Sequence, residues 1–181
     1  MRNFILGIIV TLACLAAGAY IYFGGGFAPV ATSAQAMPFE RQLANMALEA
    51  HVDKQAPKNV PIAADEANLT AGARTYKDDC AVCHGMPGEK DLTPQAKGMF
   101  PKPPQLFRGH GVTDDPPGVT YWKVANGIRL TGMPSFKPSL SETQMWQVSL
   151  LLANADKLPQ AAQQVLGGEL APQGAPHQHE H

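Results

Sequence analysis

The sequence is poor in aromatic residues, in net charge and in cysteine. Only 7% of its 181 residues are Phe, Trp or Tyr, and the formal net charge is −1. A nucleic-acid-binding surface needs a basic stripe with interleaved aromatic side chains, so this class of function is excluded. The sequence also has no catalytic carboxylate pair, nucleophile elbow or phosphate-binding loop that would indicate a separate enzymatic activity. Its length suits one domain of ordinary size with appendages.

The three cysteines are Cys14, Cys80 and Cys83, and the last two belong to the motif Cys80-Ala81-Val82-Cys83-His84. A zinc site would need a second ligand pair, but no cysteine follows Cys83. A thioredoxin-like redox pair would need a βαβ context, which the sequence does not show. The spacing is instead the one by which two thiols add to the vinyl groups of haem and the next histidine becomes an axial iron ligand. We therefore predict one covalently bound haem c and no disulfide framework.

An uncharged apolar run, residues 4–23, follows Arg2 at the start of the chain. Twenty such residues are about the length of helix that crosses the hydrocarbon core of a membrane. We expect a retained anchor, because the apolar region of a cleaved signal peptide is usually only about 7–15 residues long. Ala34-Gln35-Ala36 resembles a cleavage site, so a soluble periplasmic protein cut near Ala36 is the alternative.

Composition divides the chain into four parts. The expected anchor, residues 1–26, ends in three glycines, and a stalk over residues 27–64 carries one amphipathic helix from Pro38 to about Val52. An all-α domain with long Pro/Gly-rich loops is expected over residues 65–158. Gln, Ala, Gly and Pro dominate residues 159–181, for which we expect disorder.

The helices of the domain are predicted from caps and periodicity. Thr70 is a candidate N-cap for a helix that runs into the Cys80 motif. Residues 89–118 are rich in proline and glycine and predict a wrapped loop with one helical turn near residues 93–98, packed on the haem. A short helix is expected over residues 121–127, and Ser141 with Gln144 has the capping-box spacing that begins the last helix.

A haem iron with a second axial ligand is an electron carrier, whereas an iron with a vacant position binds ligands or catalyses. The candidates for a second ligand lie downstream of the motif: Met86, Met99, His110, Met133, Met145 and the C-terminal histidines. Met86 is too close to His84 to reach the opposite face of the ring, and Met145 falls on the apolar stripe of the last helix. Spacing does not exclude Met99 or His110. Met133 lies 49 residues after His84 between a glycine and a proline, which suits a tight loop that presents one side chain.

Over roughly residues 65–158 the chain resembles the class I c-type cytochromes. The likeness rests on motifs in the right order: Gly72-x-x-x-Tyr76-x-x-x-Cys80-x-x-Cys83-His84, Pro104-x-Leu106, Asn126-Gly127-Ile128, Gly132-Met133-Pro134 and a terminal amphipathic helix. The resemblance implies a small all-α bundle whose first and last helices cross at Gly72, with Tyr76 and Trp146 nearby. It further implies thioether bonds from Cys80 and Cys83 and axial ligation by His84 and Met133.

The resemblance also implies a set of haem contacts. The carbonyl of Pro104 would accept a hydrogen bond from His84, although the long spacing leaves Pro101 and Pro103 as competing choices. Leu106 would line the haem face. Trp122 and Arg129 are candidates for contacts with the haem propionates, and core packing is an equally good interpretation of Trp122.

Histidine and thioether ligation would leave the iron no free site, so we expect an electron carrier and not an enzyme. Residues 65–158 hold ten basic and ten acidic residues, so net charge does not select a partner. We expect redox partner proteins at the bacterial cytoplasmic membrane, with the haem domain in the periplasm acting as a shuttle or as the cytochrome subunit of a respiratory or dehydrogenase complex. The alternative is a haem enzyme or gas sensor whose distal ligand is open or displaceable.

Overall fold

The computed structural model describes residues 1–108 and 113–167, and over these residues it contains helices and no strand. This confirms the predicted all-α class. The chain divides into two compact units, residues 1–42 and 43–181. His110 and residues 168–181, with the C-terminal histidines, lie outside the described residues.

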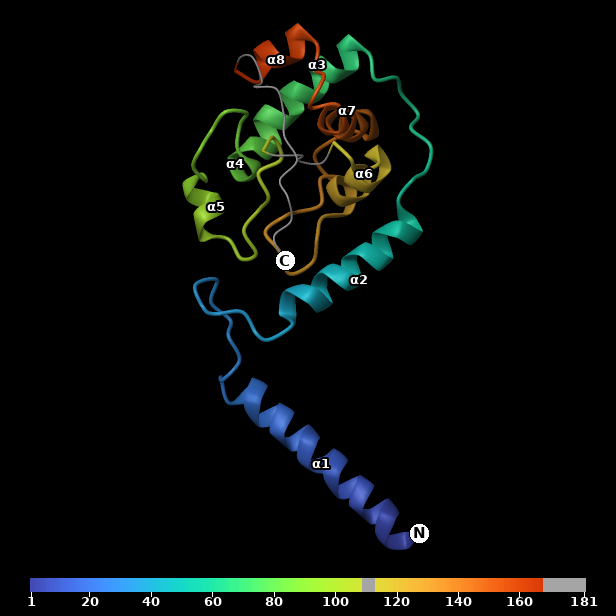
Figure 1. The fold of residues 1–181 in the computed structure, drawn as a ribbon, viewed down its shortest axis with the longest axis vertical. Helices are drawn as coiled ribbons and strands as arrows, with labels where there is room; N and C mark the ends of the chain where they lie inside the picture. The colour runs from blue at the N-terminus through green and yellow to red at the C-terminus, as the bar shows by residue number, and fades with distance from the viewer. Residues whose placement is uncertain (109–112, 168–181) are drawn as a thin grey trace, which may run out of the picture. The chain divides into compact units, whose positions relative to one another are not determined.

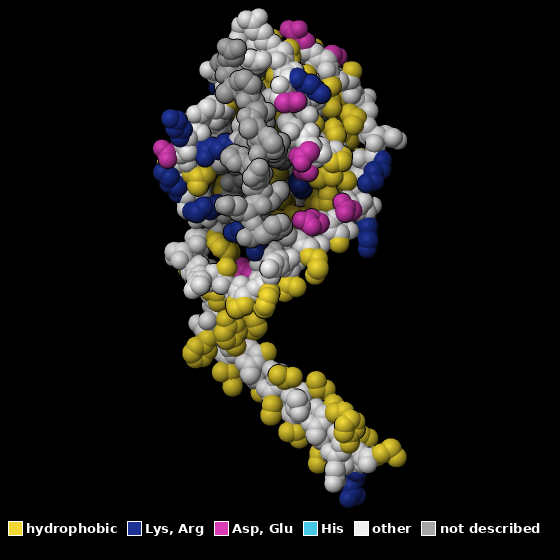
Figure 2. All heavy atoms as spheres, in the orientation of Figure 1, with side chains coloured by type: hydrophobic (Ala, Val, Ile, Leu, Met, Phe, Trp, Pro, Cys, Tyr) yellow, Lys and Arg dark blue, Asp and Glu magenta, His cyan; other side chains and the backbone are white. Residues whose placement is uncertain are grey.

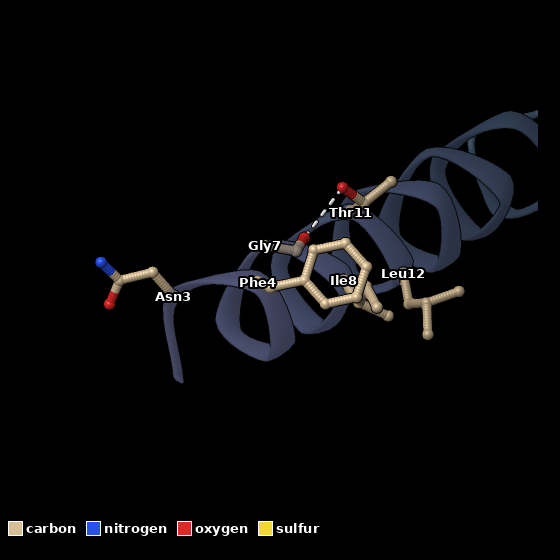
Figure 3. Close-up of a pocket in the computed structure, with 6 residues that line it drawn as sticks. All are labelled: Asn3, Phe4, Gly7, Ile8, Thr11 and Leu12. Atoms are coloured by element: carbon tan, nitrogen blue, oxygen red, sulfur yellow. Dashed lines mark hydrogen bonds between the residues drawn. The ribbon is translucent and has the colours of Figure 1, made fainter. Parts of the chain in front are cut away.

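The first unit consists mainly of helix α1 (Arg2–Gly24), which has no buried residue. Its surface is almost entirely apolar apart from Arg2 at its start (Figure 2). The hydroxyl of Thr11 donates to the Gly7 carbonyl at 2.9 Å, so this polar group is satisfied within the helix (Figure 3). The helix is long and apolar enough to cross a membrane, and a signal sequence at the N-terminus would have the same features.

The second unit contains most of α2 and all later helices (Figure 1). Their bounds are α2 (Glu40–Gln55), α3 (Glu66–Thr75), the π-helical η1 (Tyr76–Cys80), α4 (Ala81–His84), α5 (Pro94–Gly98), α6 (Pro117–Asn126), α7 (Glu142–Ala153) and α8 (Gln160–Val165). Helices α3, α6, α7 and α8 pack together and enclose the core.

The crossing of α3 and α7 depends on Gly72. A Cβ at Gly72 would overlap the backbone carbonyl of Gln147, so only glycine allows the helices this close. The side chain of Gln147 donates to Asn68 at 2.9 Å and adds a polar contact at the crossing. The predicted crossing of the first and last domain helices at Gly72 is therefore confirmed.

The ends of several helices differ from the predicted ones. Asp65, not Thr70, caps α3, because its carboxylate accepts the backbone N–H of Asn68 at 2.8 Å and the helix begins earlier. Helix α6 likewise begins at Pro117 instead of Tyr121. The predicted capping box of α7 and the predicted turn at α5, capped by Thr93, are both present.

The stalk helix and the start of the tail both have buried residues. Helix α2 begins at Glu40 instead of Pro38, and its C-terminal end packs on the domain through Val52 and Ala56, both buried. The expected disorder from residue 159 is wrong for α8, where Ala162 and Leu166 are buried. Small apolar residues at helical spacing let this short helix pack on α3.

Candidate haem-binding site

The Cys80 motif lies on a short helical segment with an unusual start. In η1 the backbone N–H of Ala81 reaches the carbonyl of Tyr76, the spacing of a π-helix, and α4 then completes the turn. Cys80 and Cys83 are free thiols and are half-buried. Burial and, to a smaller extent, the neighbouring Asp79 raise the pKa of the Cys80 thiol to about 12, so it is held in its neutral form.

The imidazole of His84 is fixed by one backbone carbonyl. Its Nδ1 lies 2.7 Å from the carbonyl oxygen of Pro104. Because a carbonyl can only accept, Nδ1 carries the proton and donates, and Nε2 is left with its lone pair. Burial lowers the pKa of His84, while the bond to Pro104 opposes that shift, so the ring is kept neutral as an iron ligand must be. Of the three candidate prolines, Pro104 makes the expected contact.

The proline-rich loop is tied to the motif by side chains that sequence reasoning missed. Thr93 donates its hydroxyl to the carbonyl of Val82 at 2.6 Å, and Gln105 donates to the carbonyl of Cys83 at 3.3 Å. The Arg108 guanidinium donates to the carbonyl of Glu89 and closes the loop on itself. The Thr93-Pro94 pair signals a helix start, but nothing in the sequence shows which carbonyl its hydroxyl reaches.

Tyr76 holds the turn that follows His84. Its buried hydroxyl donates to the carbonyl of Gly85 at 2.7 Å, and its ring meets Phe107 edge to face with the centroids 4.9 Å apart. Burial is the main cause that raises the Tyr76 pKa well above its usual value, with smaller contributions from Cys80 and Glu89. Tyr76 and Trp146 are both buried near the crossing of α3 and α7, as expected, since Trp146 directly precedes Gln147. The Trp146 ring stacks on Tyr121 of α6.

The loop that carries Met133, residues 127–136 and called the Met133 loop below, folds back over the end of α6. Gly127, which ends that helix, has a φ of +68°, and a Cβ there would lie 2.6 Å from the backbone of Pro134 and Ser135. The Ser135 hydroxyl donates to the carbonyl of Ala125 at 2.6 Å, closing the loop on the helix. Met133 itself is half-buried against the hydrophobic core.

The remaining candidates are divided between the core and the surface. Leu106 is half-buried against the core, and Met145 is buried in it, as its position on the apolar stripe predicted. The Trp122 ring lies edge to face with the ring of His51 of α2, with their centroids 5.4 Å apart. Arg129 is exposed. Neither observation links Trp122 or Arg129 to the Cys80 motif, so their contacts with propionates stay predictions.

The donor set fits haem. Two free thiols and a neutral imidazole with a free Nε2 lie within one helical turn, and these are the groups that thioether attachment and iron ligation require. Within residues 1–108 and 113–167, no three His, Cys, Asp or Glu side chains are grouped to hold a metal ion directly.

Comparison with known proteins finds a matching family and a similar solved structure. Residues 67–150 match the family described as cytochrome C oxidase, cbb3-type, subunit III. A chain of the reducing HAO-like protein complex of Kuenenia stuttgartiensis is 28% identical over 52% of this chain and 46% of that one, with a TM-score of 0.44. No curated protein matches significantly. The motif, the helical fold and the family match place residues 67–150 among the c-type cytochromes, the haem proteins of electron transfer.

Proposed function

We propose that the protein is an electron carrier with one haem c, attached through Cys80 and Cys83 and ligated by His84 and Met133. The observation that carries the proposal is the hydrogen bond from His84 Nδ1 to the Pro104 carbonyl. That bond fixes the ring and makes Nε2 the available donor atom. Haem, when bound, supplies one-electron redox chemistry at its iron.

The side chains around the iron would favour electron transfer over substrate chemistry. His84 and Met133 would fill both axial positions and keep water and small ligands away from the metal. A thioether ligand stabilises the reduced state, and half-buried apolar residues such as Leu106 disfavour the extra charge of the oxidised state.

We also propose that α1 is retained as a membrane anchor and that the domain of residues 65–158 faces the periplasm. The length and the exposed, apolar surface of α1 fit a membrane span. Tethering would raise the effective concentration of a membrane-bound partner and replace electrostatic steering. The matching family is described as an oxidase subunit. This description supports a role as the cytochrome subunit of a respiratory complex, as the alternative to a free electron shuttle.

The ligand set is tested by optical spectroscopy of the full-length haem protein. We expect a six-coordinate low-spin spectrum with a sulfur-to-iron charge-transfer band and no carbon monoxide binding in the reduced state. Met133→Ala should lose the band and bind carbon monoxide. Met86→Ala, a matched truncation of another half-buried methionine, should leave both unchanged. Ready carbon monoxide binding by the unmutated protein would instead mean an open iron and a haem enzyme or gas sensor.

The anchor is tested by fractionation of cells that express the whole gene. A retained α1 should leave the protein in the membrane fraction after a carbonate wash, with Met1 or Arg2 as its first residue. The double variant Ala34→Leu/Ala36→Leu removes the small residues that cleavage needs and serves as the uncleaved control. A soluble wild-type protein beside a membrane-bound double variant would show that the leader is a cleaved signal.

A further inference from the structure

Met99 lies directly against the residue that precedes Met133. A Cβ at Gly132 would be 3.1 Å from Met99 Sδ and 3.2 Å from its terminal methyl carbon, so the thioether packs on the bare Cα of Gly132. Met99 is half-buried and immediately follows α5. The contact therefore joins the proline-rich loop to the Met133 loop, two segments far apart in the sequence.

The other end of α5 is held to the Cys80 motif. The Thr93 hydroxyl accepts the backbone N–H of Ala96 at 3.1 Å as the helix cap and donates to the Val82 carbonyl at 2.6 Å. Helices α4 and α5 also pack on each other (Figure 1). The start of helix α5 is therefore bonded to the Cys80 motif, and Met99, directly after its end, packs on Gly132.

The hydrogen bonds at Met133 are local by comparison. The Met133 N–H donates to the Thr131 hydroxyl at 3.1 Å, and the Met133 carbonyl accepts from Ile128 at 3.1 Å. These bonds shape the loop but do not connect it to the segment that carries His84. The packing of Met99 on Gly132 makes that connection.

We propose that Met99 is a positioning residue that holds the Met133 loop closed over the iron and so limits the access of exogenous ligands. The proposal rests on the proposed function, in which Met133 is the distal ligand. With the loop closed Met133 would ligate the iron, so an added ligand would bind only to the fraction of molecules in which the loop is open. The apparent affinity of that ligand therefore reports how firmly the loop is held.

The test is an imidazole titration of the ferric full-length haem protein, followed by loss of the charge-transfer band. Met99→Ala removes the packing on Gly132 and should tighten apparent imidazole binding about tenfold, since the open fraction rises by that factor. Met99→Leu restores the side-chain volume and should return the affinity to that of the wild type. Met86→Ala is the matched control and should not change it.

A double-mutant cycle tests whether the contact itself is responsible. In Gly132→Ala the added methyl group meets the Met99 thioether and should loosen the loop, tightening imidazole binding several-fold. In the Met99→Ala/Gly132→Ala variant the methyl group enters the vacated space, so the affinity should move back toward the wild-type value. Additive effects of the two substitutions would overturn the proposal. If Met99→Ala does not accumulate in cells, the imidazole affinities of Gly132→Ala and Met99→Leu still decide the proposal.

The results distinguish failure of this proposal from failure of the ligand assignment on which it rests. If Met99→Leu abolishes the charge-transfer band while Met133→Ala retains it, Met99 is itself the ligand and the proposed ligand set fails. If Met133→Ala abolishes the band but Met99→Ala binds imidazole as the wild type does, the ligand set stands and the positioning role is refuted.

Discussion

The Cys80–His84 segment and the Met133 loop are held in place in different ways. Bonds from distant side chains and backbone reach the first segment, including those from Thr93 and Gln105 and the carbonyl of Pro104. The Met133 loop is shaped by its own short-range bonds and by its attachment to the end of α6.

The difference teaches where each segment is vulnerable. The motif depends on many modest hydrogen bonds, each worth about 1 kcal/mol, so the loss of one is tolerated. The Met133 loop depends on a few close approaches of backbone, at Gly127 above all, where one added methyl group has no space. The following predictions test this contrast, beginning with the largest effect.

Removal of both motif thiols should have the largest effect. Cys80→Ser/Cys83→Ser leaves the Met133 loop intact but eliminates the atoms that form thioethers, so no haem should stay attached after denaturation. Mass spectrometry of the denatured chain measures this directly. Cys14→Ser, on α1, is the matched control and should keep the mass of one haem. Covalent haem on the double variant would disprove attachment at this motif.

Gly127→Ala should cost about 3 kcal/mol of unfolding free energy, because it combines a left-handed backbone with overlap against the Met133 loop. Gly88→Ala is the control, at a glycine four residues after the Cys80–His84 segment. Gly88 has a similar φ of +79° but open space around it, so only the conformational cost of about 1 kcal/mol is expected. Urea unfolding of the holoprotein measures both, and equal losses would contradict a special role for the close approach.

Tyr76→Phe should cost about 2 kcal/mol, because it leaves the Gly85 carbonyl buried without its donor. Tyr121→Phe removes a hydroxyl with no described hydrogen bond and should cost far less. Urea unfolding at neutral pH compares the two variants, and similar losses would argue against the importance of the Gly85 bond.

The same variant should change the pH dependence at high pH. The folded state raises the Tyr76 pKa above its usual value of about 10, so the unfolded chain releases this proton first as pH rises. Wild-type stability from this group is fully present below about pH 10 and falls above it by up to about 1.4 kcal/mol per pH unit. The advantage of the wild type over Tyr76→Phe should therefore shrink above pH 10, and a constant gap would refute the assignment.

Thr93→Val should have the smallest effect, about 1 kcal/mol, through loss of the α5 cap and of the bond to Val82. Thr93→Ser keeps the hydroxyl and should stay close to the wild type. Urea unfolding of the two variants measures how much free energy of unfolding the motif gains from this one of its several hydrogen bonds. A loss as large as that of Gly127→Ala would erase the contrast between the two segments.

Local signals predicted the elements whose causes are local. The capping box at Ser141, the helical turn near residues 93–98 and the helix stop at Gly127 are each set by residues a few positions apart, and all three are present. The sequence offers two capping side chains for α3, Asp65 and Thr70, and the helix begins at the earlier one, whose carboxylate accepts the Asn68 N–H. Helix α8 was missed because its stability comes from contact with α3.

The candidate site divides in the same way. The spacing of Cys80, Cys83 and His84 by itself predicts that two thiols and an imidazole lie within about one helical turn of one another, because a helix repeats every 3.6 residues. Only the tertiary structure decided that the carbonyl of Pro104 meets His84 and that Met99 packs on Gly132, because these partners are far apart in sequence. Composition and the family resemblance predicted the wrapped loop and the crossing of α3 and α7 at Gly72. Which atoms these features bring into contact depends on packing between segments far apart in the sequence.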